Sequence, residues 1–202
     1  MENAALVTLN NLVESRQGNR PNYDKAHVVL ALIYIKNEGP IGRINLMRKL
    51  RLGESTIKTM LRRMKELNLI TVDKVGGALL TDKGIELLAG IEKKVKVKEV
   101  TLSSIKWDTA MIILKGKRYI LDSLGILKLR DLIIRLGAES TLIAEIVQDK
   151  ILLPPFTDEK GMGNLLKEIR DNCKECENDD LIIFITPKDL HLAYNIALEL
   201  LE

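Results

Sequence analysis

Apolar residues recur with helical spacing through most of the first half of the chain. The pattern predicts a short helix over residues 3–15, a longer helix over residues 25–39 that Asp24 caps, and a short helix over residues 42–50. In the last of these helices we expect Ile44 and Met47 to face inward. These three helices precede the segment with the clearest pattern.

The segment from residue 54 to residue 67 places its apolar residues at positions i, i+3, i+4, i+7 and i+10, which form one face of a helix. These residues are Ile57, Met60, Leu61, Met64 and Leu67. The opposite face is expected to begin with small hydroxyls and to continue with cations. Its residues are Ser55, Thr59 and Arg62, with Lys58 and Arg63 on the flanks.

Two short runs with strand-like composition follow, over residues 69–72 and 78–81. They flank the pair Gly76-Gly77, which suits a hairpin turn that needs positive φ. Thr81 can then cap a further helix over residues 82–95. The first half of the chain is therefore expected to contain four helices, a hairpin and a closing helix.

The pattern changes after a charged run over residues 92–99. Strand and helix signals then follow in the order β-β-α-β-β-α-β-α, which predicts an α+β two-layer domain with a mostly antiparallel sheet and helices on one face. The first of these helices is expected over residues 124–136, capped by Asp122 or Ser123. We therefore expect a helix-rich domain over residues 1–96 and an α+β domain over residues 97–202.

The helices and hairpin of the first domain, with a tight break before the helix at 54–67, resemble a winged helix-turn-helix. The resemblance covers residues 24–95 and includes the LTDKG stretch at 80–84, which looks like the segment after the wing in many bacterial and archaeal regulators. The whole chain resembles an uncharacterised archaeal family that joins a winged helix to a C-terminal domain of unknown function. Residues 135–146 are similar to the small insert domain of bacterial aspartyl-tRNA synthetases.

The positive charge is concentrated in one short segment. The chain carries a net charge of +3, but residues 43–65 hold eight cations and one carboxylate, so this segment carries +7 and the remainder −4. Such asymmetry is typical of a surface that contacts nucleic acid. The resemblance implies that the helix at 54–67 enters the major groove of DNA, where its first turns meet base edges. The expected DNA-binding residues are Arg43, Ser55, Thr56, Lys58, Thr59, Arg62, Arg63 and Lys74.

Catalytic and metal chemistry find little support in the sequence. Two histidines lie far apart, and neither a nucleophile motif nor a metal-spaced carboxylate cluster is present. Cys173 and Cys176 have only His27 and His191 as further ligands for a structural zinc site. We interpret the two cysteines as a surface thiol pair or an occasional disulfide. No enzyme activity, cofactor or metal is expected.

The sequence therefore predicts a sequence-specific DNA-binding transcriptional regulator that binds double-stranded DNA as a homodimer. The C-terminal domain is expected to sense a small-molecule effector or to mediate association. The alternatives are a winged-helix protein-interaction adaptor and an RNA- or translation-linked binding protein. With no run of about 18 apolar residues and no signal peptide at the start, we expect a cytoplasmic location and no membrane partner. Two glutamines among many Lys, Arg and Glu residues favour a heat-loving source.

Overall fold

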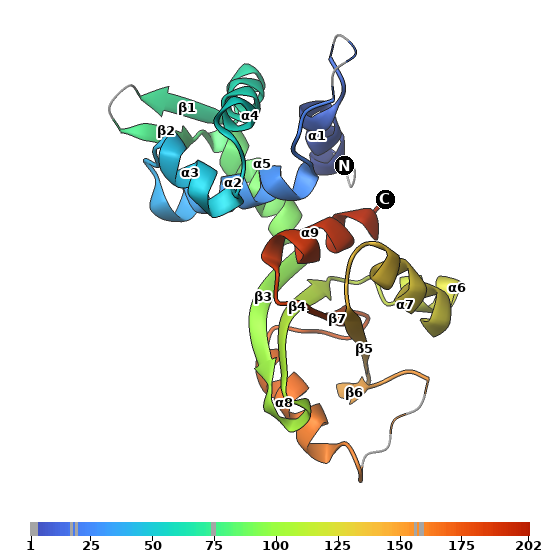
Figure 1. Ribbon diagram of the computed structural model, residues 1–202. Helices are drawn as coiled ribbons and strands as arrows, with labels where there is room; N and C mark the ends of the chain where they lie inside the picture. Colours follow the sequence, from blue (N-terminus) through green and yellow to red (C-terminus); the bar gives the residue numbers. More distant parts are fainter. Residues whose placement is uncertain (1–3, 17, 19, 74–75, 156, 158–159) are drawn as a thin grey trace. The chain divides into compact units, whose positions relative to one another are not determined.

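The computed structural model describes residues 4–16, 18, 20–73, 76–155, 157 and 160–202 (Figure 1). The chain divides into two compact units, Met1–Glu92 and Lys93–Glu202. The division precedes the predicted boundary at residues 96–97, because strand β3 begins at Val95 and belongs to the second unit. Among the described residues, none of the helices has the length and apolar character that crossing a bilayer requires.

The first unit contains five helices and a β-hairpin within its described residues, close to the predicted segments. They are α1 (Ala4–Val13), α2 (Lys25–Glu38), α3 (Arg43–Leu50), α4 (Glu54–Glu66), β1 (Ile70–Asp73), β2 (Gly77–Leu80) and α5 (Asp82–Glu92). This helix-rich arrangement agrees with the fold class predicted for the N-terminal half. Helix α5 ends three residues before the predicted end.

Local capping explains where the helices begin and end. The Asp24 carboxylate accepts a hydrogen bond from the His27 backbone N–H at 3.0 Å, and the Thr81 hydroxyl accepts one from the Gly84 N–H at 3.1 Å. Both residues were predicted as caps. Arg51 adopts the left-handed conformation with φ of 54° at the end of α3, which produces the tight break before α4.

The hairpin lies directly against the segment that precedes α3. Ile41 and Ala78 exchange two backbone hydrogen bonds of 3.1 and 2.9 Å. Gly77, with φ of 105°, permits this approach, because a Cβ at that position would lie 2.4 Å from the Ile41 carbonyl oxygen. The absence of a side chain at residue 77 therefore fixes the hairpin beside the start of α3.

The core of the first unit surrounds α2, in which residues 28–32 are all buried. The inner faces of the neighbouring helices pack around it. The expectation that Ile44 faces inward is wrong, because 61% of this residue is exposed. Leu46 and Leu50 are the buried residues of α3, and a residue two positions before Leu46 points about 200° away from it on a helix.

The second unit contains a five-stranded sheet in the order β3-β4-β7-β5-β6, in which every neighbouring pair is antiparallel. Its elements are β3 (Val95–Leu102), the 3₁₀ turn η1 (Ser103–Ile105), β4 (Trp107–Leu114), α6 (Tyr119–Leu124), α7 (Ile126–Arg135), β5 (Ser140–Val147), β6 (Lys150–Leu152), α8 (Gly163–Asn172), β7 (Leu181–Thr186) and α9 (Leu190–Glu199). The sheet confirms the predicted α+β class and its antiparallel strands.

The predicted two-layer arrangement, with helices on one face, is wrong because both faces of the sheet are covered (Figure 1). Met111 and Phe184 belong to a buried cluster that includes Ile169 of α8. The alternate residues Ile112 and Ile183, which point to the other face, are also fully buried, and α7 and α9 contact the strands there. The continuous apolar runs of β4 and β7 are the sequence signal for burial on two sides.

The region predicted as one helix over residues 124–136 contains two helices. Gly125, with φ of 76°, separates α6 from α7. Neither Asp122 nor Ser123 caps α7, because both residues lie inside α6. The last helix, α9, starts after Pro187, and the Asp189 side chain accepts a hydrogen bond from the Leu192 N–H at 2.9 Å.

Replacing Phe184 with Ala should destabilise the second unit strongly. Phe184 is fully buried in the cluster beneath α8, and removal of such a ring typically costs about 3–5 kcal/mol. Denaturant unfolding followed by the fluorescence of Trp107, the sole tryptophan, which packs against the same cluster, measures the loss. Leu127→Ala, at a residue 69% exposed, should change the free energy of unfolding by less than about 0.5 kcal/mol. Equal effects of the two substitutions would contradict the assigned core.

Candidate nucleic-acid interface

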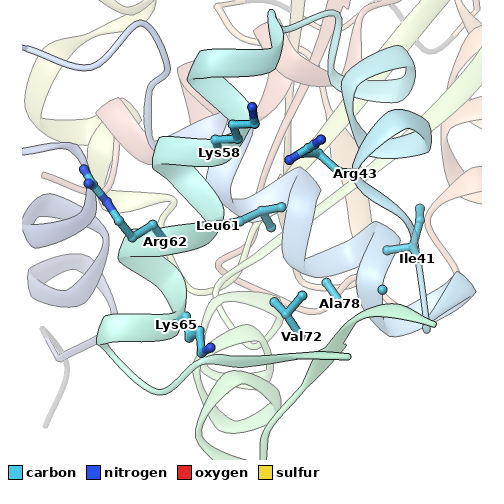
Figure 2. Close-up of a pocket in the computed structure, with 9 residues that line it drawn as sticks. Ile41, Arg43, Lys58, Leu61, Arg62, Lys65, Val72 and Ala78 are labelled. Atoms are coloured by element: carbon cyan, nitrogen blue, oxygen red, sulfur yellow. The ribbon is translucent and has the colours of Figure 1, made fainter. Parts of the chain in front are cut away.

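The outer face of α4 and the start of α3 present four exposed cations, of which three were predicted. Arg43 lies at the first position of α3, and Lys58, Arg62 and Lys65 follow one another along α4 (Figure 2). Lys65 was not among the predicted residues. Its position seven residues after Lys58, two helical turns along the same stripe, is the signal that could have identified it.

The predicted hydroxyl residues lie at the start of the same helix but differ in accessibility. Ser55 is exposed, whereas Thr56 and Thr59 are half-buried. The Thr59 hydroxyl donates a hydrogen bond to the Ser55 carbonyl oxygen at 3.0 Å. This internal bond occupies the hydroxyl proton of Thr59. Ser55 is therefore the hydroxyl best placed to donate to an external ligand.

Glu54 links two of the cations at the start of α4. Its Oε1 atom lies 2.8 Å from Lys58 Nζ and 3.1 Å from Arg43 Nη2. The ammonium of Lys58, and then Arg43, hold the pKa of Glu54 below its ordinary value, so this carboxylate is ionised at neutral pH. All three side chains are about half exposed. The contact therefore orders the cations and masks part of their charge, but contributes little to stability.

Arg62 makes a looser contact than the other cations. Its Nε atom lies 3.8 Å from Glu66 Oε1, and 66% of its side chain is exposed. Glu66 is engaged by Arg16 at 2.6 Å, which lowers the pKa of Glu66. Its carboxylate partner is shared with Arg16, and Arg62 is the most exposed of the predicted cations that the structure describes.

Arg63 does not belong to the exposed face, which corrects the prediction that it binds DNA. Only 3% of the residue is exposed, and its Nη1 atom donates hydrogen bonds to the carbonyl oxygens of Leu12 at 2.9 Å and Glu14 at 2.7 Å. Buried Tyr23 donates its hydroxyl to the same Leu12 oxygen at 2.8 Å, and burial raises the pKa of Tyr23. The guanidinium of Arg63 therefore holds the end of α1 against the inner side of α4.

Lys74, the remaining predicted contact, lies outside the described residues. The strands on either side of it are described, and they form one wall of a hollow of about 330 Å³ between α4 and the hairpin. The lining residues are Ile41, Arg43, Lys58, Leu61, Arg62, Lys65, Val72, Gly77 and Ala78. Leu61, which was placed on the inner face of α4, is half-buried and lines this hollow.

The two cysteines form a disulfide between Cys173 and Cys176 at the end of α8. Of the two predicted alternatives, the structure has the disulfide and not the surface thiol pair, and Cys173 is buried in the cluster with Ile169 and Phe184. Trp107 packs against the same cluster. This part of the second unit is therefore structural core.

Comparison with known proteins identifies both parts of the chain at the level of domains. Residues 27–86 match the family model of the PH0730-like N-terminal domain, and residues 105–202 match that of a domain of unknown function, DUF4443. The solved structure of the hypothetical protein PH0730 from Pyrococcus horikoshii OT3 shares 24% sequence identity, with a TM-score of 0.65 over 87% of this chain and 90% of that chain. No curated protein matches the sequence.

The two matches confirm the predicted resemblance to an archaeal two-domain family at the level of its domains and fold. Along the sequence, the match to the PH0730-like N-terminal domain precedes the match to DUF4443.

Replacing Arg63 with Ala should loosen α1 from the first unit. The substitution removes two hydrogen bonds from a charged donor, and each such bond contributes roughly 1.5–3 kcal/mol. We expect a loss of about 3–6 kcal/mol, with faster amide hydrogen exchange along α1. Arg62→Ala is the matched control, because its side chain is exposed, and it should leave the exchange rates of α1 unchanged. Equal exchange rates in the two variants would place Arg63 at the surface.

Proposed function

We propose that the first unit is a winged helix-turn-helix and that the protein is a sequence-specific DNA-binding regulator of transcription. The observation that supports this proposal is the row of exposed cations on α4 and at the start of α3, beside the hairpin. Helix α4 would enter the major groove, where the side chains of its first turns can reach base edges. The hairpin would act as the wing.

The chemistry of the exposed face suits a duplex. Arg62 can form two hydrogen bonds with a guanine, and Ser55 can donate to a base or a phosphate. Arg43 and Lys58 would exchange the carboxylate of Glu54 for backbone phosphates. Arg63 takes no part in this contact, because it is buried behind α4.

The proposed regulator is a homodimer, because one recognition helix reads a single half-site. We propose helices α1 and α5 as the dimer elements. Leu6, Leu9 and Leu12 of α1 are buried within the first unit, whereas Val7 and Ile85 have about half of their surface exposed. Val7 and Ile85 are therefore the residues of these helices that could meet a second copy. The second unit is proposed to bind an effector or to mediate association.

Arg62→Ala should weaken binding to duplex DNA about 5- to 100-fold, because Arg62 is the most exposed of the predicted cations that the structure describes. The melting temperature should stay nearly unchanged, since the side chain is exposed. Fluorescence anisotropy over a salt series measures both the affinity and its salt dependence. Arg130→Ala, the same change at an exposed residue of α7, is the control and should bind like the unmodified protein. A protein that binds no duplex at about 50 mM salt would refute the proposed function.

Glu54→Gln should strengthen binding to DNA roughly three- to tenfold at low salt, because it removes a carboxylate that pairs with Arg43 and Lys58. The gain should shrink as the salt concentration rises. Glu86→Gln makes the same charge change on an exposed part of α5 and should have a smaller effect. Weaker binding by Glu54→Gln would show that Glu54 itself contacts the DNA, or that it positions the cations.

A further inference from the structure

The hollow between α4 and the hairpin has an apolar floor and cations at its two ends. Figure 2 shows Arg43 and Lys58 at one end, Lys65 and Val72 at the other, and Leu61 between the two ends. Ala78 and Ile41 are buried at its base. Val72 has 45% of its surface exposed. A ligand for this hollow therefore needs an apolar middle and negative charge on both sides.

We propose that the hollow seats one sugar–phosphate strand of a DNA duplex and that its apolar floor selects deoxyribose over ribose. A deoxyribose ring presents a methylene group at its 2′ position, where ribose has a hydroxyl, and carries a phosphate on either side, which matches the order cation, apolar floor, cation. The inference rests on the proposed function. It adds the apolar floor of the hollow as a contact beside the base-reading residues of α4, and it states which nucleic acid the protein accepts.

The spacing of the cations fits a strand of this kind. Lys58 and Lys65 are seven residues apart on α4, which corresponds to a rise of about 10 Å along the helix. One strand of a duplex carries a phosphate about every 3.4 Å along its axis. Two or three consecutive phosphates, with the sugars between them, therefore fall within reach of the two lysines. The sugars between these phosphates lie over Leu61 and Val72.

Among the described residues, Ile41 and Ala78 at the base of the hollow have no backbone N–H left to donate to a ribose hydroxyl. The backbone N–H groups of Ile41 and Ala78 are already donated to each other's carbonyl oxygens, and the Leu61 and Val72 side chains are apolar. A 2′-hydroxyl placed there would lose water without gaining a partner. RNA and DNA differ at a given site through this group. A ribonucleotide in the seat should therefore bind more weakly than the deoxyribonucleotide.

The test uses a duplex selected from random DNA by binding to the full chain. A series of variants of this duplex carries one ribonucleotide each, at every position in turn, so the helix keeps its form while a single 2′-hydroxyl is moved along it. We expect a loss of affinity of about 5- to 100-fold at one or two neighbouring positions of one strand and less than twofold elsewhere. As a control, the ribonucleotide-containing strand alone is added as a competitor, which shows whether strands released from the duplex contribute to the measured binding.

Val72→Ser places a hydroxyl on the floor and should reduce the ribonucleotide penalty at those positions to less than about threefold, because the serine can pair with the 2′-hydroxyl. Leu127→Ser is the control, since Leu127 is 69% exposed on α7 and does not line the hollow. This variant should keep the full penalty. Lys65→Ala should lower the slope of log affinity against log salt by about one, which tests the cationic end of the seat independently.

The outcomes separate the two proposals. If the unmodified protein binds no duplex at low salt, both the proposed function and the proposed deoxyribose site in the hollow are refuted. If it binds DNA but no single ribonucleotide changes the affinity more than twofold, the deoxyribose seat is refuted while the proposed function stands. The seat is also refuted if Val72→Ser keeps the same penalty as the unmodified protein. A reduced penalty in Val72→Ser alone supports it.

Discussion

The buried guanidinium of Arg63 is the interaction on which the arrangement of the first unit depends. It crosses from α4 to the carbonyl oxygens of Leu12 and Glu14, which are left unpaired by the end of α1. A cation in the interior is stabilised only when such partners surround it. Because of this contact, α1 covers the side of α4 that carries Arg63. The side that carries Arg62 is exposed to solvent.

Much of this unit could be predicted from the sequence because the signals are local. The spacing of Ile57, Met60 and Met64 indicates the inner face of α4, and these three residues are fully buried. Asp24 and Thr81 act as caps through contacts three residues away. The position of Arg63 depends instead on carbonyl groups about fifty residues earlier in the chain. A helical wheel places it on the flank of the polar face, where burial and exposure cannot be distinguished.

In the second unit, too, the features that depend on contacts between distant segments could not be predicted from the local sequence pattern. Element types could be predicted from periodicity, but the number of covered faces depends on where separate helices pack. The runs AMIIL and LIIFI contain no polar residue at either alternating phase, which is the local trace of burial on both sides. The hollow beside α4 was also missed. It requires Leu61, Val72 and Ala78, from three different elements, to meet.

The two open edges of the five-stranded sheet determine how this unit can meet other molecules. One edge is β6, which is three residues long. The other is β3, an eight-residue strand that carries Lys96, Lys98 and Glu99 along its length. A short edge strand offers few backbone groups with which a strand of another molecule could pair. A charged edge strand disfavours such pairing because the charged side chains would be brought against the added strand. The sheet is thereby protected from growth into aggregates, and its contacts with partners are left to the side chains of the surrounding helices.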